Sequence, residues 1–201
     1  PLHHLLLSDE LDCLVMTSGN KSDEPIAYRD AEAVAQLNGI ADFFLVHNRE
    51  IHTRCDDSVL KPFRGKATFL RRARGFCPAP IRLQRRLQRH AQGGEKSILA
   101  CGAALKNTFC LTRQNYAFLS QHIGDLENAE TLASFEQGVD HFRRLFRVTP
   151  AAVACDLHPE YLSTKWATEQ VAADSQGPLA GLPLLLVQHH HAHLAACLAE
   201  N

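Results

Sequence analysis

The sequence has no long apolar run and no pair of cysteines spaced as Cys-x-x-Cys. Its uncharged apolar stretches are far shorter than the roughly 18 residues that a membrane-spanning helix needs, and no secretory signal peptide is visible. The seven cysteines are odd in number and scattered, mostly in apolar surroundings where a free thiol behaves as a small hydrophobic side chain. These absences predict a cytoplasmic protein with no membrane partner.

Neither sign of charge is in excess, with 21 Lys and Arg against 22 Asp and Glu. Between Lys61 and His90, however, there are ten Lys or Arg and no Asp or Glu. Such a block suits an anionic ligand, either a phosphate or a nucleic acid, and it also suits a solvated linker. Only Phe63, Phe69 and Phe76 lie near it, and this scarcity of stacking aromatics disfavours RNA binding.

Neither end of the sequence resembles a natural terminus. There is no initiator methionine, the chain opens in a leucine-rich, helix-like stretch, and it stops at Asn201 inside an expected helix. We therefore expect an internal segment of a longer protein. The 201 residues, 45% hydrophobic and 21% charged, have ordinary globular composition and suffice for one large or two small domains.

The run Gln188-His189-His190-His191-Ala192-His193 is a candidate metal site. An apolar stretch of the length of a buried strand precedes it, and good helix formers follow it. Residues four apart share a helix face, so His189 and His193 can hold one ion, whereas the two histidines between them point elsewhere. Iron, zinc and nickel all accept imidazole. On spacing alone, histidines that bond nearby carbonyls are an equal alternative.

The first half contains two groups of candidate phosphate ligands. A buried strand expected at residues 11–17 leads into Ser18 and Asn20, which predict a nucleotide or acyl-phosphate pocket, although a simple polar turn also fits. A helix at 31–37 and strands at 43–46 and 67–70 follow. Around the last strand stand Ser58, Arg71, Arg72 and Arg74, where arginine suits bidentate phosphate binding. Asp56 or Asp57 could face Mg²⁺, and a structural ion-pair cluster with Arg54 fits them equally.

Residues 84–96 read as a linker, because arginines and two glycines make poor regular structure. The second half then restarts with strands expected at 98–101, 109–112 and 117–120. A glycine turn after the first strand would let the backbone approach a phosphate, with Lys106 supplying charge. Asp125 or Asn128 could cap a helix whose core face is a phenylalanine and valine stripe. Strands at 153–155 and 184–187, with a helix from Ser163 between them, complete two α/β units.

Taken in order, these clusters resemble the central part of the HypF-type carbamoyltransferases of [NiFe] hydrogenase maturation. The resemblance covers nearly the whole chain. It rests on TSGNKSDEPIA (17–27), HNREI and RCDDSV (47–51 and 54–59), RRARGFCPAPI (71–81), GAALKNTFCL (102–111), SQHIGDLEN (120–128), DLHPEYLST (156–164) and QHHHAH (188–193).

The resemblance implies the fold and the division of the chain. Residues 1–83 are expected to form the C-terminal part of a YrdC-like α/β domain, which makes carbamoyl adenylate. Residues 97–201 are expected to form the N-terminal part of a TsaD-like domain of the actin/hexokinase-type ATPase fold, which transfers the carbamoyl group. That domain uses an HxxxH metal pair, which matches His189 and His193, so the resemblance favours the metal alternative.

The resemblance also implies the reaction. Carbamate derived from carbamoyl phosphate attacks ATP, and the resulting carbamoyl adenylate gives its carbamoyl group to the C-terminal cysteine of HypE. Expected cofactors are ATP, Mg²⁺ and a divalent transition metal, iron or zinc; no catalytic residue is assigned and no nucleic acid is expected. A segment of this kind should be inactive alone. The alternatives are an O-carbamoyltransferase of secondary metabolism and an RNA-binding module related to tRNA threonylcarbamoylation.

Overall fold

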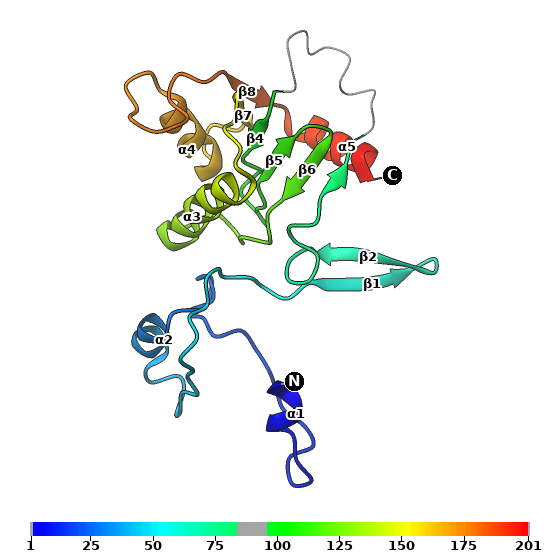
Figure 1. Ribbon diagram of the computed structural model, residues 1–201, viewed down its shortest axis with the longest axis vertical. Helices are drawn as coiled ribbons and strands as arrows, with labels where there is room; N and C mark the ends of the chain where they lie inside the picture. The colour runs from blue at the N-terminus through cyan, green and yellow to red at the C-terminus, as the bar shows by residue number, and fades with distance from the viewer. Residues whose placement is uncertain (1, 84–95, 201) are drawn as a thin grey trace. The chain divides into compact units, whose positions relative to one another are not determined.

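The computed structural model describes residues 2–83 and 96–200 (Figure 1). The chain divides into two compact units, one of Pro1–Ser22 with Ile26–Arg54 and one of Asp23–Pro25 with Cys55–Asn201. Of the linker expected at residues 84–96, all but the last residue lies outside the described residues.

The first unit contains two short helices, α1 (Leu2–Leu6) and α2 (Asp30–Leu37), and the second confirms the helix predicted at 31–37. The strands predicted at 11–17 and 43–46 are wrong, since the unit's described residues form only the isolated bridges Ser8 to Leu11 and Asn38 to Ala41. Val15 is 100% exposed and Phe43 is 92% exposed. A strand pattern needs a neighbouring strand for its N–H and C=O groups, and the described residues of this unit supply none.

The second unit is built on a six-stranded sheet with the order β3-β6-β5-β4-β7-β8. Its first four strands pair antiparallel, whereas β4, β7 and β8 run parallel. The mixed α/β class and the strands predicted for this half are confirmed. The strands are β3 (Ile81–Arg82), β4 (Ile98–Ala100), β5 (Cys110–Arg113), β6 (Tyr116–Leu119), β7 (Ala152–Asp156) and β8 (Leu184–Val187).

Helices α3 (Ala129–Phe146) and α4 (Leu162–Val171) lie together on one side of this sheet (Figure 1). The α3 stripe is core as predicted, because Phe135, Val139 and Phe142 are buried, and Phe135 packs edge-on against Trp166 of α4. Of the two predicted caps, Asn128 is the one used: its side-chain oxygen accepts the N–H of Thr131 at 2.8 Å.

A separate antiparallel hairpin, β1 (Val59–Phe63) with β2 (Lys66–Arg71), belongs to the same unit and confirms the strand predicted at 67–70. After β8 the chain enters α5 (His189–Glu200). No helix among residues 2–83 and 96–200 is long and apolar enough to cross a membrane.

Candidate metal centre

The first turn of α5 is fixed by Gln188, which follows β8 directly. Its side-chain oxygen accepts the backbone N–H of His190 at 2.7 Å and that of His191 at 3.2 Å, satisfying N–H groups that a helix start leaves free. The amide nitrogen of Gln188 also lies 2.9 Å from Nδ1 of His190, which holds that ring away from the other histidines. Gln188 therefore fixes the backbone of the first turn of α5.

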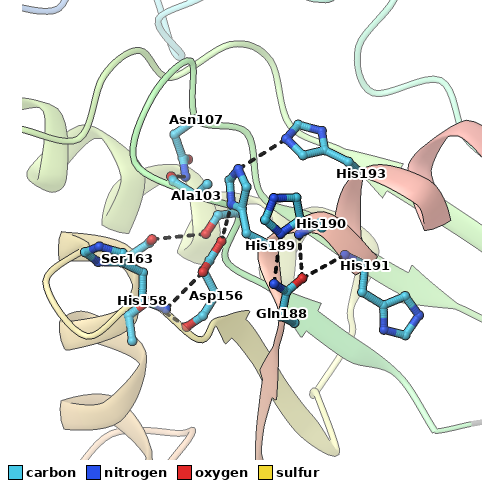
Figure 2. Close-up of polar contacts among 12 residues, drawn as sticks. Ala103, Asn107, Asp156, His158, Ser163, Gln188, His189, His190, His191 and His193 are labelled. Atoms are coloured by element: carbon cyan, nitrogen blue, oxygen red, sulfur yellow. Dashed lines mark hydrogen bonds and ion pairs between the residues drawn. The ribbon is translucent and has the colours of Figure 1, made fainter.

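His189 and His193 face one another across one helical turn (Figure 2). Their Nε2 atoms are 3.1 Å apart and the two rings are nearly perpendicular, at 83°. Two metal–nitrogen bonds of about 2.0–2.1 Å drawn from these atoms would meet at roughly 100°, close to the tetrahedral angle. The pair therefore fits a divalent transition metal. No cluster of three or more His, Cys, Asp or Glu side chains able to hold an ion occurs among the described residues.

Asp156, at the carboxyl end of β7, contacts the His189 nitrogen that faces away from His193. Its Oδ2 lies 2.6 Å from Nδ1 of His189, and its Oδ1 accepts the backbone N–H of His158 at 2.9 Å. The carboxylate side chain is only 6% exposed. Burial by itself raises the pKa of Asp156, but the hydrogen bonds from His189 and from the His158 amide outweigh it, and the pKa lies below its ordinary value.

Sequence reasoning assigned no role to Asp156. The contact arises because β7 and β8 pair in parallel with Asp156 opposite Val187, two residues before His189. The signal in the sequence is an acidic residue at the end of a buried strand, since carboxyl ends of parallel strands meet at one edge of a sheet. Tyr161 is an aromatic neighbour of the site. Its ring centroid lies 6.4 Å from that of His189, and its ring stacks on that of His158 at 4.2 Å.

The loop after β4, the third parallel strand, leaves the same edge of the sheet. Gly102 has φ +70°, and a Cβ there would lie 2.3 Å from the carbonyl oxygen of Thr108. Asn107 donates to the carbonyls of Cys101 at 2.9 Å and Ala103 at 2.6 Å, while its own side-chain oxygen is buried with no hydrogen-bond partner within the described residues. The loop is thus a tightly closed turn.

Two further contacts tie this loop to its surroundings. Ser163 at the start of α4 donates to the Gly102 carbonyl at 3.0 Å. The backbone N–H of Lys106 donates to Asp125 Oδ1 at 2.5 Å, and Lys106 itself is exposed. Asp125 thus fixes the turn that carries Lys106, and Asn128 is the residue that caps α3.

The residues predicted to bind phosphate in the basic block make contacts within the protein. Ser58 accepts the N–H of Ala73 at 2.8 Å and donates to the Arg74 carbonyl at 2.9 Å. Arg72 donates to the Ala79 carbonyl at 2.8 Å, and Arg74 forms an exposed ion pair with Asp57 at 2.5 Å.

Arg71, at the end of β2, is half-buried and has no side-chain hydrogen-bond or ion-pair partner among residues 2–83 and 96–200. Ser18 and Asn20 lie in the first unit, in a turn where the Asn20 N–H donates to the Ser18 carbonyl at 3.2 Å. The Asn20 amide donates to the Lys21 carbonyl at 2.8 Å.

The fold and the site together define the class of this protein: it is a mixed α/β protein with a candidate metal-binding histidine pair at the carboxyl edge of a partly parallel sheet. Two family models then match the sequence. The HypF Kae1-like domain matches residues 93–200, and the Sua5/YciO/YrdC model, described as telomere recombination, matches residues 1–73. The chain belongs to the HypF family.

Individual relatives agree with this assignment. The chain is 42% identical over 201 residues to carbamoyltransferase HypF of Synechocystis sp., covering all of this chain and 24% of the relative. It is 47% identical over 191 residues to carbamoyltransferase HypF2 of Cupriavidus necator, covering 94% of this chain and 22% of the relative. The chain therefore spans about a quarter of the length of the curated relatives it matches.

Solved structures confirm the fold. A crystal structure of full-length HypF in its phosphate- and nucleotide-bound form superimposes with a TM-score of 0.84 at 45% identity, covering 98% of this chain and 29% of that one. The crystal structure of HypF from T. kodakarensis superimposes with a TM-score of 0.79 at 37% identity, covering 92% of this chain and 23% of that one.

Proposed function

We propose that this chain is the central part of a carbamoyltransferase of [NiFe] hydrogenase maturation, which activates the carbamoyl group with ATP and transfers it to the C-terminal cysteine of HypE. The observation that carries the proposal is the pair His189 and His193, with facing Nε2 atoms, in a chain that matches a YrdC-type model and then a HypF Kae1-like model. The names of the relatives, carbamoyltransferases throughout, support the transferase chemistry. The proposed compartment is the cytoplasm.

In the first step, carbamate from carbamoyl phosphate attacks the α-phosphate of ATP and pyrophosphate leaves, giving carbamoyl adenylate. Ser18, Asn20 and Ser58 supply polar contacts, Mg²⁺ accompanies the ATP, and the arginines Arg71, Arg72 and Arg74 neutralise phosphate charge. Among these arginines, Arg71 is the most available, since Arg72 binds a backbone carbonyl. The guanidinium of Arg74 forms an exposed ion pair with Asp57, which costs little to exchange for phosphate. The related full-length HypF in its phosphate- and nucleotide-bound form supports this assignment.

In the second step, the HypE thiolate attacks the carbamoyl carbon of the adenylate, so that a thiocarbamate forms and AMP leaves. His189 and His193 would hold the metal, iron or zinc, which would supply Lewis-acid polarisation of a carbonyl or phosphate oxygen when bound. Asp156 holds the His189 ring in place. The exposed Lys106 amine stands on a turn fixed by Asp125 and contributes positive charge for a nucleotide phosphate. No cysteine of this chain is needed as nucleophile.

The test is His189→Ala in the complete protein that contains this segment. Carbamoyl transfer and metal uptake should be lost, while ATP–pyrophosphate exchange should persist, because exchange depends on the YrdC-like part. His191→Ala is the matched control, since His191 points away from the pair in Figure 2 and should retain both activities. Loss of exchange together with transfer in His189→Ala would contradict the division of labour.

A further inference from the structure

Asp156 and Gln188 hold two neighbouring histidines in opposite ways. Nδ1 of His189 faces a carboxylate oxygen at 2.6 Å, whereas Nδ1 of His190 faces the amide nitrogen of Gln188 at 2.9 Å. A carboxylate only accepts hydrogen bonds, and an amide NH₂ only donates them. The proton of His189 is therefore on Nδ1, and the proton of neutral His190 is on Nε2.

We propose that Asp156 is a positioning residue that fixes the Nδ1-protonated form of His189, so that the Nε2 lone pair points toward His193 and becomes the metal ligand. This inference rests on the metal-binding role proposed above for the histidine pair, which it deepens. Asp156 acts through His189 and need not touch metal or substrate.

Further hydrogen bonds restrict both the side chain and the backbone of Asp156. Its second oxygen accepts the His158 N–H at 2.9 Å, and its main-chain carbonyl accepts the hydroxyl of Thr164 at 3.0 Å. Because the side chain is nearly buried, it has little freedom to turn away from His189. A carboxylate bonded to the outer nitrogen of a ligating histidine is a common way of fixing both the tautomer and the ring orientation of that ligand.

These contacts also dictate what an amide would do in place of the carboxylate. In Asp156→Asn, the side-chain oxygen must accept the His158 N–H, since an NH₂ group cannot. The NH₂ group is then left facing Nδ1 of His189, which must become the acceptor. The substitution keeps the size of the side chain but moves the His189 proton to Nε2, where it occupies the lone pair that a metal needs.

The experiment uses the complete protein that contains this segment, labelled with ¹⁵N-histidine, and has two readouts: the nitrogen shifts without metal and the affinity for Zn²⁺ alone. In the unsubstituted chain, His189 should show a protonated Nδ1 and His190 a protonated Nε2. In Asp156→Asn, the two nitrogens of His189 should exchange roles and zinc should bind about 10–100-fold more weakly. Circular dichroism verifies that the variant is folded, and the first readout needs no variant at all.

Asp56→Asn is the matched control. It makes the same chemical change in a partly buried Asp–His pair, Asp56 with His122 at 2.9 Å, and should leave zinc affinity and the His189 shifts unchanged. An unprotonated Nδ1 on His189 in the unsubstituted chain, or unaltered zinc affinity in folded Asp156→Asn, would overturn the inference. If the shifts exchange as expected but the unsubstituted complete protein takes up no zinc, the positioning of His189 stands and the proposed metal role of the pair fails.

Discussion

Asp56 and His122 are 66 positions apart in sequence, yet Oδ2 of the aspartate lies 2.9 Å from Nδ1 of the histidine. Both side chains are mostly buried, at 20% and 17% exposed. The backbone adds a second link, because the N–H of His122 donates to the Arg72 carbonyl at 3.2 Å. Together these contacts hold the segment around the β1–β2 hairpin against the loop that follows β6.

Removing one member of this pair should destabilise the second unit. Asp56→Ala leaves a mostly buried imidazole without its partner, which costs about 1–3 kcal/mol of unfolding free energy. Urea denaturation of Asp56→Ala, His122→Ala and the double variant should give a coupling energy of about 1 kcal/mol or more, as for other contacting buried pairs. The measurement reports on the pair itself, since each single variant removes the same contact.

Asp57→Ala is the control for this cycle. Asp57 is adjacent in sequence, but its partner is the exposed Arg74 and its own side chain is 73% exposed. An exposed ion pair contributes roughly 0–1 kcal/mol, so this variant should unfold nearly as the unsubstituted chain does. Equal losses of unfolding free energy for Asp56→Ala and Asp57→Ala would show that the contact between Asp56 and His122 contributes no more to stability than an exposed ion pair does.

Gly102 is predicted to tolerate a side chain less well than Gly181, a glycine of similar φ in the loop before β8. A Cβ at this position would meet the Thr108 carbonyl oxygen at 2.3 Å, in addition to the strain of a φ of +70°. Gly181 has nearly the same φ, +71°, but open space around its Cβ position. Gly181→Ala should therefore cost about 1–2 kcal/mol of unfolding free energy, and Gly102→Ala clearly more. Thermal unfolding of the two variants tests this. Equal losses of stability would mean that the loop around Gly102 rearranges to accommodate the added Cβ.

The second half of the chain was predictable because local pattern and tertiary environment agree there. The stripe of Phe135, Val139 and Phe142 has helical spacing and is also the face that packs on the sheet. The strands at 11–17 and 43–46 were mispredicted because an apolar run shows only that burial or pairing is favourable. Whether a partner strand exists is a property of other parts of a fold, which the run itself does not encode.

The candidate site was predictable in part for the same reason. His189 and His193 meet through helical spacing alone, and helical spacing is local. Asp156 stands 33 positions earlier and reaches His189 only through the register of β7 against β8. Such a contact requires strand order and register, neither of which could be read from this sequence. The roles of Ser18, Asn20 and the arginines remain predictions, since they concern ligands.

Two cysteines of the second unit, Cys101 and Cys110, predict a loss of stability at alkaline pH. Burial raises the pKa of Cys110 to about 12 and raises that of Cys101 as well. Below the ordinary thiol pKa, both folded and unfolded chains keep these protons, so the thiols have no effect on stability. As the pH rises from about 9 towards 12, the unfolded chain releases protons that the folded chain retains, and the unfolding free energy falls by up to about 1.4 kcal/mol per pH unit for each thiol.

Urea denaturation between pH 8 and pH 11 measures this slope, and Cys110→Ala should make it shallower. Alkylation provides a second reading at neutral pH. The exposed Cys13 and Cys197 should react with iodoacetamide in the folded chain, whereas Cys101 and Cys110 should react only after unfolding. Rapid labelling of Cys110 in the folded chain would show that this thiol is not shielded by the sheet. An alkaline slope unchanged by Cys110→Ala would show the same, because a thiol that ionises at its ordinary pKa in both the folded and the unfolded chain does not change the unfolding free energy with pH.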